Sequence, residues 1–238
     1  MIRYGMLLLI FCMFGSVCAD TSLLKLELDR FIDEKVLLWE HHDDAQASID
    51  ALKTKGHTNY TIVESMSRCL RRDLNFTNEE IGGYKANMAI YWIGELGDQN
   101  QISNLLYVAQ VSTNNVLAAA AIQSYHRRIN DKGRFLDEAL PLLERSSKLK
   151  TAIWWCLEED ASGPMRERIV SAASEKLKAG FENLYYADRI LSKWKIGYAD
   201  SPERKRLIAA AAEDPVVEKE FPRVRKCLLE RLDKGVVK

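Results

Sequence analysis

The segment AIYWIGELGD, residues 89–98, decides the fold that we expect for this chain. Its apolar residues favour a helix, and Gly97 stands where a helix commonly ends in a left-handed residue. Asp98 begins the tetrapeptide DQNQ, residues 98–101, which has the spacing of a capping box at the start of a helix. The segment therefore predicts two consecutive helices joined by a short turn. We assign Asp98 a structural and not a catalytic role, since an aspartate at a helix start stabilises it by about 1 kcal/mol.

The remainder of the chain has the pattern of helices throughout. Apolar residues recur three and four positions apart, as in Ile62, Met66 and Cys69, and strands with alternating apolar and polar residues are absent. Start and stop signals divide the chain into about nine or ten helices of roughly 12 to 20 residues. Pro141 and Pro222 fall inside otherwise helical patterns, so each predicts a kink or a boundary. These patterns predict an all-α fold.

An internal period indicates a repeat architecture. Three residues that tolerate the left-handed end of a helix are spaced 33 positions apart: Gly97, Asn130 and Gly163. Three alanines in the preceding helices have the same spacing: Ala86, Ala119 and Ala152. Small residues let neighbouring helices pack closely, so we expect these alanines to be buried, and we expect Ala161, beside a charged run, to be exposed. A fixed period of this length is typical of a helical solenoid, whose units bury their apolar faces only against their neighbours.

The segment around Gly97 also resembles a known repeat. Residues 93–98, IGELGD, are similar to the L-G-x-L-G-D motif of bacterial, PBS-lyase-like HEAT repeats, with Ile93 in place of the first Leu. The copy that ends in IND, residues 129–131, keeps the hydrophobe, the turn residue and the Asp, whereas the copy at residues 152–163 lacks the Asp. The resemblance covers residues 77–163 and implies a HEAT-like α-solenoid of antiparallel helix pairs. We assign the repeat residues structural roles: Ala86, Gly97, Asp98, Ala119, Asn130, Asp131, Ala152 and Gly163.

The first 19 residues have the three parts of a secretory signal peptide. A short segment with the single charge of Arg3 precedes the apolar run LLLIFCMF, residues 7–14. The tripeptide VCA, residues 17–19, then offers small side chains to a signal peptidase. We therefore predict cleavage after Ala19, a secreted or periplasmic location, and a single all-helical domain over residues 20–238.

Charge and hydropathy exclude other classes of protein. Without Arg3 the mature chain has 33 basic and 34 acidic residues, whereas a nucleic-acid binder usually has a strong basic excess, so we expect no nucleic-acid partner. The uncharged N-terminal stretch is shorter than the roughly 20 apolar residues of a transmembrane helix, and no later segment is long enough. Lipidation of Cys18 is disfavoured because Val17 precedes it where a very small residue is expected.

Motifs that carry catalytic or metal chemistry are weak. The cluster HHDD, residues 41–44, lacks the i, i+4 spacing of helical metal ligands, and Ser22 with Lys25 lacks the companion motifs of penicillin-binding enzymes. The run EED, residues 158–160, is most simply an exposed charged helix end. We therefore expect no catalytic site, metal or cofactor. Three widely spaced cysteines leave open either one disulfide with one thiol or three thiols: Cys69, Cys156 and Cys227.

Adjacent aromatic residues are the candidate binding surface. They form three pairs: Tyr91 with Trp92, Trp154 with Trp155, and Tyr185 with Tyr186. Neighbours on a helix cannot both face one core, so we expect one aromatic ring of a pair to be partly exposed, and exposed aromatics are common anchors of interfaces. The alternative is that these rings belong to the core. We predict a non-catalytic interaction or scaffolding module that binds another protein or a cell-envelope component. The alternative class is an enzyme or accessory subunit with an unidentified substrate.

The cleavage site gives the first testable prediction. Because VCA, residues 17–19, has the side chains that signal peptidase accepts, the exported protein should begin at Asp20. N-terminal sequencing of the protein recovered from the envelope or the medium measures this directly. A mature protein that still begins with Met1 would contradict the prediction.

Overall fold

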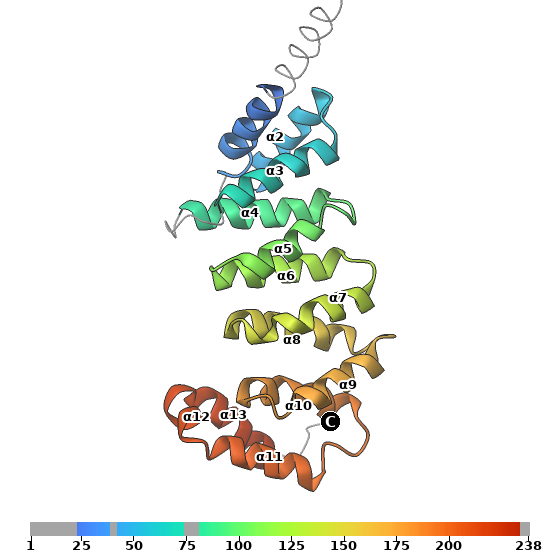
Figure 1. Cartoon of the computed structure of the whole chain (residues 1–238), viewed down its shortest axis with the longest axis vertical. Coiled ribbons are helices and arrows are strands. Elements are labelled where there is room, and N and C mark those ends of the chain that lie inside the picture. Colours follow the sequence, from blue (N-terminus) through green and yellow to red (C-terminus); the bar gives the residue numbers. More distant parts are fainter. Residues whose placement is uncertain (1–22, 39–41, 74–80, 234–238) are drawn as a thin grey trace, which may run out of the picture. The chain divides into compact units, whose positions relative to one another are not determined.

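The computed structural model describes residues 23–38, 42–73 and 81–233 (Figure 1). Every regular element in these ranges is a helix, which confirms the all-α prediction for the described part of the chain. None of the described helices is long and apolar enough to cross a membrane. The predicted signal peptide, residues 1–19, lies outside the described residues. The chain divides into two compact units, Met1–Arg128 and Ile129–Lys238, which are described separately below.

The first unit is a set of packed helices. A helix over residues 23–35 is followed by five others: α2 (His42–Thr54), α3 (Asn59–Asp73), α4 (Ile81–Leu96), α5 (Ser103–Val111) and α6 (Asn115–Arg128). Helix α3 packs against α4, α5 packs against α6, and α4 packs against α6. The core between them is apolar and includes fully buried Ile62, Met66, Ile93, Leu105 and Ile122. Each helix therefore buries one face against the next helices along the chain.

Ion pairs fasten the first helix to its neighbours. The carboxylate of Asp29 accepts a hydrogen bond of 2.6 Å from Ser65 and two charged bonds from Arg68, at 2.6 and 2.9 Å. Burial alone would raise the pKa of Asp29, but these hydrogen bonds and the charges of Arg68 and Arg72 hold it below its usual value. Asp33 bonds in the same way to Arg72 and Lys85, at 3.0 and 2.9 Å. The helix over residues 23–35 is thus joined to both α3 and α4.

In the turn after α4, Asp98 and Gly97 have structural roles that differ in part from those predicted. The Asp98 carboxylate accepts the backbone N–H of Asn100 at 2.9 Å and of Gln101 at 2.8 Å, so it caps the turn over residues 99–102. It does not cap a helix as predicted, because α5 begins only at Ser103. Positive φ occurs in the described residues only at Gly56, Gly180 and Gly197, so the left-handed conformation predicted for Gly97, Asn130 and Gly163 is wrong. Gly97 is instead required by space, because a Cβ there would lie 2.5 Å from the carbonyl oxygen of Ile93.

Of the three alanines spaced 33 positions apart, two are buried as predicted and one is not. Ala86 and Ala152 are buried, but Ala119 is half-buried, since the buried face of α6 passes through Ala118. The strict 33-residue register is therefore wrong by one position in α6. Ala161 is fully buried and not exposed. Its side chain continues the face of α8 that also carries Trp154 and Leu157, which are both fully buried.

The second unit contains helices of different lengths. They are α7 (Lys132–Ala139), the 3-10 helix η1 (Leu140–Glu144), α8 (Ser147–Asp160), α9 (Arg166–Lys176), α10 (Phe181–Trp194), α11 (Pro202–Ala212), α12 (Pro215–Glu220) and α13 (Pro222–Asp233). Of these, α8, α10 and α13 have the predicted length of roughly 12 to 20 residues, and the other helices are shorter. Pro141 lies in η1 and Pro222 begins α13, so both proline boundaries are confirmed. Side chains of Asp131, Ser146 and Ser201 accept backbone N–H bonds at the starts of α7, α8 and α11.

Helix α10 lies at the centre of the contacts in this unit. It packs against α8, α9 and α11. Its Asp188, with 1% exposure, binds Arg204 of α11 at 2.7 Å and Arg231 of α13 at 3.2 Å. Burial raises the pKa of the nearby Tyr198 hydroxyl, and the charge of Asp188 raises it further. A buried carboxylate thus ties three helices together. Among the described cysteines no disulfide forms.

The close contact at Gly97 predicts a specific loss of stability. Gly97→Ala places a methyl group against a backbone oxygen that cannot move without disturbing α4, at a cost of about 1–3 kcal/mol in the free energy of unfolding. Gly83→Ala, in the first turns of the same helix, is the matched control because no described atom lies within 4 Å of its Cβ position. It should be neutral or stabilising by up to about 1 kcal/mol. Urea unfolding of both variants measures the difference, and equal effects would contradict the assignment.

Candidate functional site

The two adjacent tryptophans of α8 have opposite environments. Trp154 is fully buried, and its indole N–H donates a hydrogen bond of 3.1 Å to the side-chain oxygen of Asn183 in α10. Trp155 is 55% exposed. Successive residues of a helix point about 100° apart, so the burial of one indole turns the other outward. Trp155 is thus not held in the core.

In the other two aromatic pairs, the exposures of the two rings differ less than those of Trp154 and Trp155. Tyr91 is 42% exposed and meets buried Trp92 in a T-shaped ring contact with centroids 5.1 Å apart. Tyr185 and Tyr186 are both half-buried, and the hydroxyl of Tyr186 is 2.9 Å from that of Thr151 in α8. An aromatic ring with large exposure is therefore found in two of the three pairs. Of these, Trp155 is the larger and more exposed.

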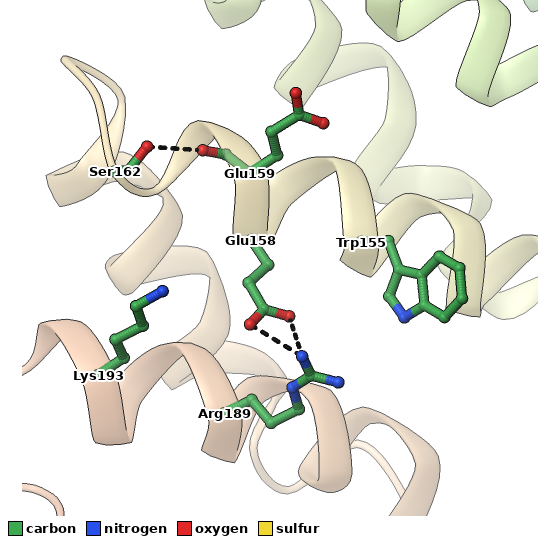
Figure 2. A pocket seen from close by; sticks show the side chains of 6 residues that line it. All are labelled: Trp155, Glu158, Glu159, Ser162, Arg189 and Lys193. Carbon is green, nitrogen blue, oxygen red and sulfur yellow. Dashed lines mark hydrogen bonds and ion pairs between the residues drawn. The ribbon is translucent and has the colours of Figure 1, made fainter. Parts of the chain in front are cut away.

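Trp155 lies at the edge of a cavity of about 480 Å³ between α8 and α10 (Figure 2). The cavity is lined by Trp155, Glu158, Glu159, Ser162, Arg189 and Lys193. The guanidinium of Arg189 contacts both carboxylate oxygens of Glu158, at 2.9 and 3.0 Å. Figure 2 shows Glu159 directed away from this ion pair. Ser162 donates a hydrogen bond of 2.9 Å to the backbone carbonyl of Glu159.

The spacing of these residues explains why they meet. Trp155 and Glu158 are three positions apart near the end of α8, which places them on one face of the helix, and Ser162 lies in the turn that follows. Arg189 and Lys193 are four positions apart on α10. Because α8 packs against α10, the two faces line the same hollow.

A second hollow continues along the same helices. It has a volume of about 280 Å³ and is lined by Ser147, Thr151, Glu182, Tyr185, Tyr186, Phe221, Arg223, Val224 and Cys227. Between the helices, Lys150 forms an ion pair of 3.0 Å with Glu182. We call the surface that contains both hollows the α8–α10 face. Trp155 lines its first hollow, and Tyr185 and Tyr186 line its second.

The charges of the first hollow are balanced. Its two carboxylates, Glu158 and Glu159, are matched by Arg189 and Lys193. The Glu158–Arg189 pair is partly exposed, and such pairs stabilise a fold by about 0–1 kcal/mol, so its main effect is to fix the orientation of both groups. The ammonium of Lys193 lies 5.0 Å from the ring centroid of Trp194, which favours one position for it.

Sequence reasoning found part of this site. It named Trp155 and described residues 158–160 as an exposed charged run, whereas Glu158 is half-buried and paired. It missed Arg189 and Lys193, whose i, i+4 spacing of like charge on one helix face was the available signal. No group of three or more His, Cys, Asp or Glu side chains among the described residues is arranged to hold a metal ion. Of the sequence cluster at residues 41–44, Asp43 and Asp44 are exposed, and His41 lies outside the described part.

Comparison of the chain with protein-family models, with curated proteins and with solved structures finds no match in any of the three. The function is therefore argued from the α8–α10 face itself.

The contrast between the two tryptophans predicts different effects on stability. Trp154→Ala leaves a large cavity and removes the partner of Asn183, so it should lower the free energy of unfolding by about 3–5 kcal/mol. Trp155→Ala should change it by no more than about 0.5 kcal/mol, because the indole is mostly in solvent. Chemical denaturation of the two variants provides the comparison. If Trp155→Ala were as damaging as its neighbour, Trp155 would be a structural residue and not a binding residue.

Proposed function

We propose that this chain is a non-catalytic binding or scaffolding module, whose α8–α10 face holds another protein or a component of the cell envelope. The observation that carries the proposal is the exposed indole of Trp155 beside an ordered ion pair, at a position where the fold has no need of it. Tryptophan, tyrosine and arginine are the residues that contribute most often to binding energy at interfaces. This face contains all three types.

The HEAT-like solenoid is the architecture that we propose for this module. Support comes from the spacing of polar contacts between helices of the same unit. In the first unit, Arg71 with Asn104 and Ser124 with the carbonyl of Ile90 are 33 and 34 positions apart. In the second, Lys150 with Glu182 and Thr151 with Tyr186 are 32 and 35 positions apart. Contacts that recur near one period are expected where each repeat packs on the next.

The proposed place of action follows from the signal-peptide pattern of residues 1–19. A secreted or periplasmic module with an extended helical surface suits a partner that is itself outside the cytoplasm. Solenoid surfaces bind extended partners because many shallow contacts are distributed over several helices. The two hollows of the α8–α10 face fit that mode of binding, since α8 and α10 line both of them and α13 adds further residues to the second.

Site-specific photo-crosslinking tests this function. The photoreactive residue p-benzoylphenylalanine is placed at position 155, and separately at position 196, where the native Ile196 is fully exposed and lies outside the α8–α10 face. Irradiation in intact cells of the source organism should give a discrete adduct from position 155 and none from position 196, and mass spectrometry identifies the partner. Equal labelling from both positions, or no adduct from position 155, would count against a partner at this face.

A further inference from the structure

We infer that the cavity beside Trp155 binds an uncharged saccharide, with the indole as a stacking surface and the Glu158–Arg189 pair as the polar wall. The inference rests on the proposed binding function of the α8–α10 face and names the chemical class of ligand at one end of it. A polysaccharide of the envelope, or the glycan of a partner protein, would supply the sugar ring that stacks on the indole.

The exposed indole provides a flat apolar surface that only some ligands can use. The face of an aromatic ring is electron-rich, so it attracts C–H groups that carry a small positive charge. A sugar ring has such C–H groups on its faces and hydroxyl groups around its rim. The fold does not require this indole, because the neighbouring Trp154 already fills the core and makes the buried hydrogen bond to Asn183.

The polar groups around the indole match a polyhydroxylated ring. Glu158 accepts hydrogen bonds and Arg189 donates them, so the ion pair by itself offers both kinds of partner. A sugar hydroxyl both donates and accepts, so it can bond a carboxylate and a guanidinium at once. Hydrogen bonds to charged groups are stronger than those between neutral groups. The contact of Arg189 with both oxygens of Glu158 holds these two groups in place before a ligand arrives.

Charge and size select an uncharged ligand of small to moderate size. The lining residues carry two negative and two positive formal charges, and the polar wall is the Glu158–Arg189 pair, which is neutral as a whole and so does not attract an ion strongly. An ionic ligand would compete with the existing Glu158–Arg189 pair, whereas hydroxyl groups can bond both partners and leave the pair intact. An apolar ligand would remove water from the charged groups without replacing its hydrogen bonds. The hollow is wide open to solvent, and its volume of about 480 Å³ leaves room for a short saccharide that lies against the surface.

Calorimetric titration of the purified mature chain tests the inference. The probes are three uncharged trisaccharides, maltotriose, cellotriose and chitotriose, together with the anionic trigalacturonate and the cationic trimer of glucosamine. At least one uncharged probe should bind saturably and more tightly than either charged probe. Trp155→Ala should weaken that binding about tenfold or more, and Trp155→Phe, which keeps a smaller ring, should give an intermediate affinity. Glu158→Gln should weaken it less than Trp155→Ala, because an acceptor oxygen remains.

Tyr107→Ala is the matched control, because Tyr107 is an exposed aromatic residue of the other unit and its loss should leave the affinity unchanged. The inference is overturned if no uncharged probe binds saturably, if a charged probe binds best, or if Trp155→Ala binds like the wild type. A protein adduct from position 155 without saccharide binding would overturn the saccharide inference and leave the proposed function standing. Saccharide binding that depends on Trp155 without such an adduct would support the inference and exclude a protein as the partner.

Discussion

The hydrogen bond from the buried indole of Trp154 to Asn183 determines how the second unit is assembled. Both groups are out of contact with water, so either one alone would leave an unsatisfied polar atom at a cost of about 1–3 kcal/mol. Asn183 also donates to the carbonyl of Ala179, at 2.8 Å, which fixes its amide. The contact therefore sets one register between α8 and α10. The outward position of Trp155, and with it the candidate binding site, is a consequence of that register.

Helix α10 connects this seam to the rest of its unit. On one side it contacts α8 through Asn183 and Arg189, and on the other its Asp188 binds Arg204 and Arg231. Loss of one partner from a buried ion pair costs more than the pair contributes, because the remaining charge stays buried. Such a helix cannot rotate to relax one contact without breaking another. The walls of the cavity are therefore held more rigidly than a partly exposed surface would suggest.

Local signals in the sequence predicted the helices and some of their boundaries, since those depend on neighbouring residues. The boundaries at Pro141 and Pro222 are examples. The sequence did not predict that Ala119 is half-buried or that Asp188 is buried, because helix faces and long-range ion pairs depend on how separate helices pack. For the same reason it identified Trp155 but not Arg189, which lies on a different helix. The spacing of Arg189 and Lys193, four positions apart, shows that they share a helix face but not which helix that face meets.

Two ion pairs join α8 to α10, and the order of acid and base along α8 is the reverse of the order along α10. On α8 the base Lys150 precedes the acid Glu158, whereas on α10 the acid Glu182 precedes the base Arg189. This order matches opposite charges only when the two helices run in the same direction. If one helix were reversed, Lys150 would face Arg189 and the two acids would face each other. Each pair contributes little to stability, yet together they encode the direction of the chain, so a misfolded arrangement with one helix inverted is penalised twice.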